Sequence, residues 1–249
     1  MTVAAVLFDL DGTLLDHRRS AVEGLRSWLD SFGRPLTADL EAAWFIAEAE
    51  HYQCWLDGLI SHEEQRRRRL RDFLPLLGLA VGPDAELDDL YTGGFLAAYE
   101  SAWCGFADLD IVPACRTADL RTGVLTNGSV RQQNAKTRAL GLAGCLDVVV
   151  TSEELGWAKP DPRAFRMACQ RLGTAPEQTV YVGDNHEVDV LGARSAGLRA
   201  VHVDRLGAGP SQESQQIATL ADLWRHLLIE RPPHPSVDDP GQPNNGLTG

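Results

Sequence analysis

Short apolar runs, most of them continuous and each ended by small or acidic residues, recur along the chain. They cover residues 3–8, 122–125, 146–150, 179–182 and 198–203. Continuous apolar runs of this length are typical of strands buried on both faces of a parallel sheet. Helical spacing of apolar positions separates them, at residues 130–140, 162–172 and 187–196. Strands that alternate with helices predict an α/β fold with an open parallel sheet built from βαβ units.

A helical block interrupts this alternation after the first strand. Residues 16–103 show no strand pattern and divide into about four helical segments. Ser61, followed three residues later by Glu64, is a capping box and predicts a helix start inside the block. We therefore expect an all-helical cap domain at 16–103, inserted into a Rossmann-like core formed by residues 1–15 and 104–230. The tail at 231–249 is rich in Pro, Gly and Asn and is predicted to be disordered.

Composition and charge limit the possible partners. Hydrophobic residues make up 44% of the 249 residues and charged residues 23%, as in ordinary globular proteins. The net charge of −12 repels nucleic acid at long range, so we expect no nucleic-acid partner. A small anionic substrate stays possible, because local cations can outweigh the net charge at short distance. We expect a monomer or a homodimer.

The sequence also indicates a compartment. No apolar run approaches the length of a membrane span, so we expect no membrane partner. The apolar residues 3–8 have no basic residue before them and end in aspartates, which is unlike a signal peptide. The five cysteines form no C-x-x-C pair, which disfavours structural zinc or a disulfide scaffold. These features predict a cytoplasmic protein.

Four polar clusters follow predicted strands or the loops directly after them. Because ligands bind at the carboxyl ends of the strands in open α/β sheets, all four are expected at one edge. The clusters are Asp9 with Asp11, then Thr126-Asn127-Gly128-Ser129, then Lys159-Pro160, and last Gly183-Asp184 with Asp189.

The residue types in these clusters suit phosphate chemistry. Carboxylates brought together repel one another and need a cation, and an all-oxygen set favours Mg²⁺ over zinc. Lys159 can hold a phosphate as a point charge. The side chains of Thr126 and Asn127 can donate hydrogen bonds to phosphoryl oxygens. Gly12 and Gly128 allow backbone amides to approach the phosphate closely.

These clusters, in this order, resemble the motifs of the haloacid dehalogenase (HAD) superfamily. The resemblance extends over residues 3–228 and is to the helical-cap phosphatase branch (C1, subfamily IA-like). One departure is a segment before Thr126 that is short by about one helical turn, so we expect a short helix at 114–120. The matching residues are Asp9-Leu10-Asp11-Gly12-Thr13, Leu125-Thr126-Asn127-Gly128, Lys159-Pro160, Gly183-Asp184-Asn185 through Asp189, and residues 192–197.

The resemblance implies a mechanism and a cofactor. It implies that Asp9 attacks phosphorus and forms an aspartyl-phosphate, while Asp11 acts as the general acid and then the general base. Lys159 is implied to stabilise the nucleophile. Mg²⁺ is implied as the cofactor, held by Asp9, the backbone carbonyl of Asp11 and Asp184, with Asp189 as a further or water-mediated ligand. The implied enzyme is a phosphoric monoester hydrolase.

Two other functions stay open. The first is a 2-haloacid dehalogenase, in which Asp9 attacks carbon; dehalogenases of this family generally lack an aspartate where Asp11 stands. The second is a non-catalytic binding module on the same scaffold. For a phosphatase we expect a small phosphorylated metabolite as substrate, such as a nucleotide, phosphoglycolate or a sugar phosphate.

Three features allow both a structural and a functional interpretation. Asp189 can be a metal ligand or the cap of the following helix. The arginines within 66–71 can form a solvated helix face, or one of them can bind a substrate anion. The aromatic residues Trp44, Phe45, Tyr52 and Trp55 can form the core of the cap or a platform that stacks on a substrate ring.

Overall fold

Six parallel strands form one sheet in the computed structural model, which describes residues 2–227. The predicted α/β class with a helical insertion is confirmed, and all five predicted strands are present. β3 begins two residues later than we predicted, and β6 was missed because it has two residues and no apolar run. The sheet order is β3-β2-β1-β4-β5-β6, with β1 Ala5–Phe8, β2 Arg121–Thr126, β3 Val148–Thr151, β4 Thr179–Gly183, β5 Arg199–Val203 and β6 Gln216–Ile217.

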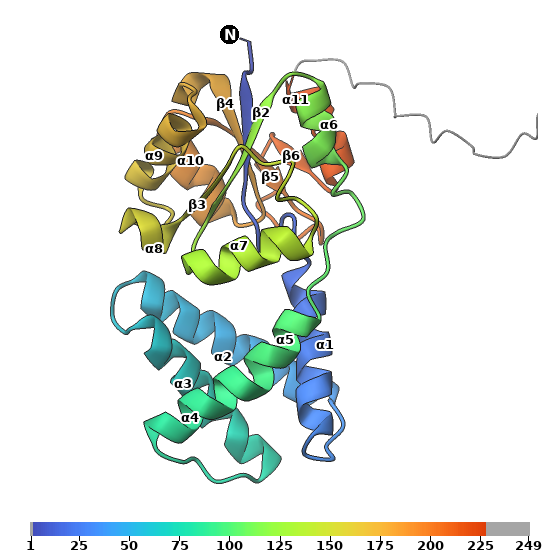
Figure 1. Ribbon diagram of the computed structural model, residues 1–249, viewed down its shortest axis with the longest axis vertical. Helices are drawn as coiled ribbons and strands as arrows, with labels where there is room; N and C mark the ends of the chain where they lie inside the picture. The colour runs from blue at the N-terminus through green and yellow to red at the C-terminus, as the bar shows by residue number, and fades with distance from the viewer. Residues whose placement is uncertain (1, 228–249) are drawn as a thin grey trace, which may run out of the picture.

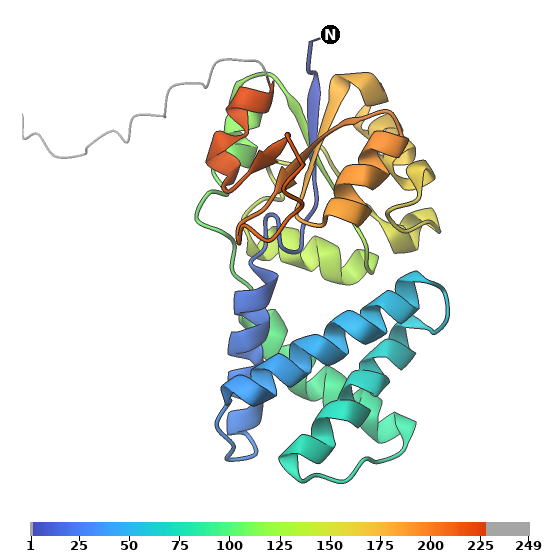
Figure 2. The same ribbon diagram turned by 180° about the vertical axis from the view of Figure 1, so that it is seen from behind.

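The central strand β1 is buried on both faces, as its continuous apolar run predicts. Val6 and Phe8 pack into the core on one face of the sheet, whereas Ala5 and Leu7 pack into the core on the other. Helices cover both faces (Figures 1 and 2). The first face is covered by α6 (Ile111–Thr117) and α11 (Trp224–Leu227), and the second by α9 (Pro162–Leu172) and α10 (Gly192–Ser195).

Two predicted helices of the core differ from the observed ones. The helix expected at 114–120 is α6, which begins at Ile111 because Pro113 is tolerated in a first helical turn. It ends at Thr117, before the predicted end at residue 120, and Asp119 beyond it adopts a left-handed φ of 58°. The helix expected at 187–196 begins as a π-helix, His186–Leu191, and continues as α10. π-Helical turns occur frequently at functional sites, and this one carries Asp189.

The remaining short elements of the core surround the carboxyl ends of the strands or connect them. α7 and α9 match their predicted ranges closely, and α8 was not predicted. Their bounds are α7 Val130–Ala139, α8 Ser152–Leu155 and the 3₁₀ turns Pro176–Gln178 and Leu220–Asp222.

The insertion between β1 and β2 begins with a helical bundle at the carboxyl ends of the strands (Figure 1). Its core is aromatic: Trp44 lies against Phe73 and Phe95. The Ser61 side chain accepts a hydrogen bond from the backbone N–H of Glu64, so the predicted helix start is confirmed. The bundle contains α1 His17–Asp30, α2 Ala38–Leu56, α3 His62–Phe73, the 3₁₀ turn Leu74–Leu77, and a last helix made of α4 Asp84–Leu90, the π-segment Tyr91–Leu96 and α5 Ala97–Ser101.

The two connections between bundle and sheet run side by side. Leu15 and Gly105 form an isolated antiparallel bridge, and the Asp16 N–H donates to the Cys104 carbonyl at 2.9 Å. This pairing lies where we placed the domain boundaries, and the division into core and cap domains stays a prediction.

The predicted disordered tail at 231–249, like residues 228–230 of the predicted core, lies outside the described residues. Within residues 2–227, no helix is both long and apolar enough to cross a membrane.

Candidate active site

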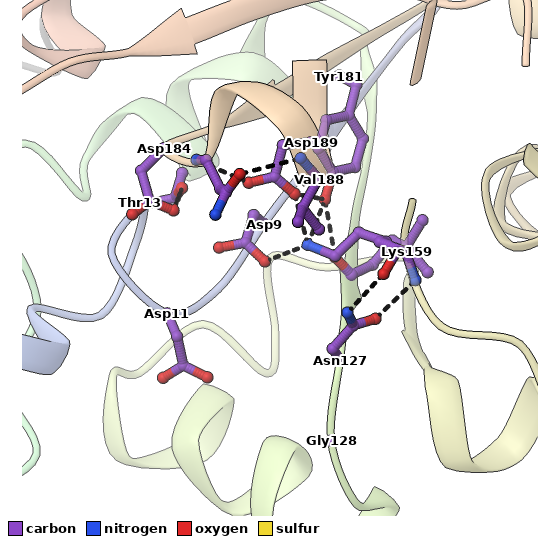
Figure 3. Close-up of polar contacts among 12 residues, drawn as sticks. Asp9, Asp11, Thr13, Asn127, Gly128, Lys159, Tyr181, Asp184, Val188 and Asp189 are labelled. Carbon is purple, nitrogen blue, oxygen red and sulfur yellow. Dashed lines mark hydrogen bonds and ion pairs between the residues drawn. The ribbon is translucent and has the colours of Figure 1, made fainter. Parts of the chain in front are cut away.

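A buried lysine lies at the centre of the sheet edge where the bundle is attached. Lys159 Nζ is 2.5 Å from Asp9 Oδ1 and 2.7 Å from Asp189 Oδ1. It also donates to the Tyr181 hydroxyl at 2.9 Å, and that hydroxyl donates in turn to the Leu125 carbonyl. Figure 3 shows the ammonium group between the two carboxylates. Only 3% of Lys159 is exposed, so this cation is balanced by protein groups and not by solvent.

Asn127, at the end of β2, fixes the backbone of Lys159. Its side-chain Nδ2 donates to the Lys159 carbonyl at 3.0 Å, and its Oδ1 accepts from the Lys159 N–H at 2.8 Å (Figure 3). One amide hydrogen of Asn127 remains for a ligand. The predicted phosphate contact of Asn127 stays a prediction beside this positioning role.

Three carboxylates lie together beside Lys159. Each of Asp9, Asp184 and Asp189 offers an oxygen, and the three atoms lie within 4.8 Å of one another. Asp9 and Asp189 are buried, whereas Asp184 is exposed and lines the cavity. Burial and the neighbouring carboxylates raise the pKa of Asp9 above its ordinary value, although Lys159 opposes this. Desolvation by the surrounding walls of the cavity, and then Asp189, raise the pKa of Asp184 to about 7. The cluster therefore disfavours three negative charges unless a further cation is present.

Asp189 lies in the carboxylate cluster and contacts the start of the following helix, whereas its role as a metal ligand stays a prediction. Its Oδ1 accepts from Lys159, and its Oδ2 accepts from the Asn185 N–H at 3.0 Å, at the start of the π-helix. The cap of that helix is Asn185, whose side chain accepts from the Val188 N–H. Asp189 thus joins the carboxylate cluster and also stabilises the first helical turn.

Asp11 lies apart from this cluster and has its own cation. Lys136 Nζ, on α7, lies 2.6 Å and 2.8 Å from the two carboxylate oxygens of Asp11, and Gln133 lies 3.4 Å from one of them. Burial would raise the pKa of Asp11, but Lys136 and His17 outweigh it and hold the pKa below its ordinary value. The carboxylate is therefore fixed in position and ionised.

A chain of polar contacts continues from this region into the bundle. His17 contacts the Tyr99 hydroxyl at 2.9 Å and Glu48 Oε2 at 3.1 Å. Arg69 donates to the other oxygen of Glu48 at 2.6 Å. Although burial opposes ionisation, Arg69 and His17 lower the pKa of Glu48 to about 2. For the same reason, Glu48 raises the pKa of His17 despite burial.

One cavity of about 320 Å³ brings most of the predicted site residues together. This volume is at the small end of the range for ligand pockets. Sheet-edge residues line one side, and α2, α3 and the last helix of the bundle line the other. The predicted residues in its lining are Asp9, Asp11, Thr126, Asn127, Gly128, Lys159, Asp184 and Asp189.

The two predicted phosphate-binding glycines have other hydrogen-bond partners. The Gly12 N–H donates to the Leu15 carbonyl, and the Gly128 N–H donates to the Ser152 hydroxyl. Gly12 is absent from the cavity lining. It has a φ of 90°, and a Cβ there would contact the Asp184 carboxylate. Gly12 therefore lets the turn approach Asp184, and phosphate contacts by either glycine stay predictions.

Sequence reasoning missed Gln133, Lys136 and Tyr181. Gln133 and Lys136 lie three residues apart on α7, so they share one helix face, and both are buried. A polar face turned toward the sheet was the available signal, because buried polar side chains need partners. Tyr181 gave no such signal within the apolar run of β4.

Two of the four aromatic residues of α2 lie in the core of the bundle and two line the cavity, and stacking on a substrate ring stays a prediction. Trp44 is fully buried in the aromatic core of the bundle, and Phe45 packs against that core. Tyr52 and Trp55 line the cavity, with ring centroids 5.2 Å apart. The core interpretation is therefore right for the first pair and wrong for the second.

Comparison with known proteins identifies the family. The model of haloacid dehalogenase-like hydrolases matches residues 3–197. Glyceraldehyde 3-phosphate phosphatase of Methanopyrus kandleri is 31% identical over 207 residues, 82% of this chain and 84% of its own. (S)-2-haloacid dehalogenase 1 of Pseudomonas sp. is 28% identical over 233 residues, 91% and 97% of the two chains. Phosphoserine phosphatase of Thermus thermophilus is 50% identical over 115 residues, and this match spans only 46% of each chain.

A solved structure shows the same fold. The magnesium-bound HAD-hydrolase YfnB of Bacillus subtilis superimposes with a TM-score of 0.80 at 22% identity, covering 92% of this chain and 100% of its own. The chain belongs to the haloacid dehalogenase-like hydrolases. Its helical insertion between β1 and β2 is that of the C1-cap, subfamily IA-like branch, so the predicted family is confirmed.

Proposed function

We propose that the protein is a Mg²⁺-dependent phosphatase that hydrolyses phosphomonoesters of small metabolites through an aspartyl-phosphate on Asp9. The observation that carries the proposal is the pairing of two acids with different surroundings at one cavity. Asp9 belongs to a carboxylate cluster at Lys159, whereas Asp11 is held separately by Lys136. Phosphatases among the curated relatives support the same reaction class.

The donor set fits Mg²⁺. It consists of carboxylate oxygens within 4.8 Å of one another, and such an all-oxygen set suits a hard cation. Asp9, Asp184 and the backbone carbonyl of Asp11 would hold the ion, with Asp189 as a further or water-mediated ligand. When bound, it would supply positive charge that keeps the carboxylates ionised and neutralises phosphoryl oxygens.

In the first step, Asp9 forms a bond to phosphorus as the bond to the ester oxygen breaks. One Asp9 oxygen is held by Lys159, and the other accepts no side-chain hydrogen bond from residues 2–227, so it is available for attack. Asp11 donates its proton to the departing oxygen. The negative phosphate beside Asp11 favours the protonated form that this step requires.

In the second step, water attacks phosphorus, Asp11 takes the proton of that water, and the bond between Asp9 and phosphorus breaks. Inorganic phosphate leaves and Asp9 is regenerated. Lys136 then holds Asp11 in the ionised form, which is the base that this step needs. Lys159 offsets charge on Asp9 throughout, so the chain contributes mainly positioning and electrostatic stabilisation.

Release of phosphate from p-nitrophenyl phosphate tests the proposal. We expect turnover with Mg²⁺, loss of turnover in excess EDTA, and recovery on adding Mg²⁺. Asp9→Asn should abolish turnover, whereas Asp30→Asn, at the exposed end of α1, should match the wild type. Full activity of Asp9→Asn would exclude the covalent mechanism.

Hydrolytic dehalogenation is the second candidate, supported by the similarity to the Pseudomonas enzyme along most of the chain. In that reaction Asp9 would attack the carbon that carries the halogen, and neither a cation nor Asp11 would be required. Chloride release from 2-chloropropionate in excess EDTA would favour this candidate over the phosphatase. A protein that releases neither phosphate nor halide would instead fit the non-catalytic binding module.

A further inference from the structure

One face of α3 supplies the wall of the cavity that the hydrolytic mechanism does not use. His62, Gln65, Arg66 and Arg69 all line the cavity. Their spacing of three and four residues places them on one side of a helix. All four side chains carry N–H donors. Burial and Arg66 lower the pKa of His62 to about 4, so its imidazole is neutral and keeps one N–H. The wall can therefore offer donors to an acceptor.

Arg66 differs from the other arginines of α3 in its charge balance. Arg67 is paired with Asp84 and Asp88, and Arg68 and Arg71 are paired with Glu64. Arg69 is paired with Glu48. Arg66 forms no ion pair with a carboxylate in the described part of the chain. Its guanidinium instead lies over the Tyr91 ring, 5.2 Å from the centroid. Its charge is thus left for a ligand in the cavity.

Two further polar groups on this wall lack partners. Gln65 is 1% exposed and Arg69 is 5% exposed. The Oε1 of Gln65 and the Nε of Arg69 are buried and have no hydrogen-bond partner among the residues described. Buried polar groups in native proteins are nearly always paired, so unpaired ones in a cavity wall indicate a missing ligand or water.

The acidic residue on the same wall does not cancel this charge. Both oxygens of Glu48 are occupied, one by Arg69 and the other by His17. Glu48 therefore offsets Arg69, and Arg66 remains as uncompensated positive charge at the distal end of the cavity. Asp9 and Lys159 line the opposite, sheet-edge end.

We infer that Arg66, with Arg69, forms a binding site for a second anionic group of the substrate. The inference rests on the proposed function, because the phosphoryl group is taken to lie at Asp9. The substrate class is then a small phosphate ester that carries a carboxylate or a second phosphate at its far end. Arginine binds both groups through two parallel hydrogen bonds.

This class differs from the nucleotide suggested by the aromatic residues of α2. Tyr52 and Trp55 do line the cavity, and a base could stack there. Stacking of a neutral base leaves the charge of Arg66 and the Nε–H of Arg69 without partners, whereas an anion satisfies them.

Equilibrium binding to the Asp9→Asn protein in the presence of Mg²⁺ tests the inference without turnover. Calorimetry would compare 3-phosphoglycerate with sn-glycerol 3-phosphate, and fructose 1,6-bisphosphate with fructose 6-phosphate. In at least one pair, the member with the second anionic group should bind about tenfold or more tightly than the member without it, because hydrogen bonds between charged groups are strong. The first pair identifies a carboxylate as the second anion, and the second pair identifies a phosphate.

The control variants lie on the same helix. In the Asp9→Asn protein that also carries Arg66→Met, the ratio of the two affinities in the discriminating pair should fall to near one. Adding Arg68→Met, which removes a half-exposed arginine paired with Glu64, should preserve it. Ratios near one in both pairs, or a ratio unchanged by Arg66→Met, would overturn the inference. If adenosine monophosphate binds more tightly than all four of these ligands, and Arg66→Met does not change its affinity, ring stacking would replace the second anion site as the explanation.

The proposed function is tested separately by p-nitrophenyl phosphate, which has no second anion. If the wild type does not hydrolyse this ester but the binding ratio depends on Arg66, the hydrolytic proposal fails and the anion site stands. If the ester is hydrolysed and the ratios are near one, the anion site fails alone.

Discussion

Replacing Glu48 by glutamine tests whether the polar chain in the bundle stabilises the protein. Glu48 accepts from Arg69 at 2.6 Å and contacts His17 at 3.1 Å, and its side chain is 17% exposed. Glutamine keeps the shape of the side chain but removes its charge. Arg69, with 6% of its side chain exposed, then loses its counter-charge in a buried position.

The size of the effect follows from the pKa of Glu48. That pKa falls from an ordinary 4.5 to about 2, and a change of one in a pKa corresponds to about 1.4 kcal/mol of free energy. The ionised form thus contributes about 3 kcal/mol to the free energy of unfolding at pH 7. Removing one partner of a buried ion pair gives a similar range of about 3–5 kcal/mol.

The pH dependence has a defined sign. Because the folded state lowers the pKa, the contribution is fully present above pH 4.5 and is lost as the pH falls toward about 2. The contribution of the Glu48 carboxylate itself to the difference between the wild type and Glu48→Gln should therefore be constant from pH 7 to about pH 5. The effect of Glu48 on the pKa of His17 adds to the difference as that imidazole becomes protonated. By about pH 3.5 the contribution of the carboxylate should shrink to about 2 kcal/mol.

Urea unfolding followed by tryptophan fluorescence measures these differences. Glu50→Gln, an exposed position on the same helix, is the matched control and should change stability by less than about 0.5 kcal/mol. The double variant Glu48→Gln with Arg69→Met should be no less stable than Glu48→Gln alone, since no unpaired charge remains. A loss at pH 7 no larger than that of Glu50→Gln would refute the reasoning.

Two further predictions concern the sheet edge. Lys136→Met removes the cation that holds Asp11 and should lower kcat/KM for p-nitrophenyl phosphate about 100-fold, the lower end for general acid–base catalysis. Lys136→Arg should restore part of this activity, and equal activity of wild type and Lys136→Met would contradict the role. Gly12→Ala should abolish turnover, because its Cβ would displace Asp184. Gly33→Ala also has a positive φ, of 64°, but meets no atom within 4 Å, so it should only lose about 1–2 kcal/mol in urea unfolding.

The parallel sheet and its functional edge were predictable because they depend on local patterns. β1 is a continuous apolar run ended by Asp9, so one pattern predicts both the strand and the position of the proposed nucleophile. The helical insertion was also recognisable, since helices lie where a second strand was expected. The order of the clusters at strand ends then predicted that Asp9, Lys159 and Asp184 lie together.

Features that depend on how helices pack were not predictable from those patterns. Lys136 reaches Asp11 from a helix 125 residues further along the chain, and no local rule links the two. Three arginines of α3 pair with acidic residues near or on α2 and α4, so these pairings depend on where those helices lie, whereas Arg68 pairs with Glu64 within α3. Only the packed bundle shows that Arg66 is left over and faces the cavity.

The position of Lys136 connects the bundle with the chemistry at the sheet edge. Its Nζ lies 5.5 Å from the centroid of the Tyr99 ring and 6.0 Å from that of Trp103. These aromatic residues belong to the insertion, and ring faces stabilise a nearby cation. Any movement of the bundle over the sheet therefore changes the surroundings of the cation that fixes Asp11. Because binding at Arg66 and orientation of Asp11 depend on the same bundle, contacts with the distal end of a substrate are expected to change kcat as well as KM.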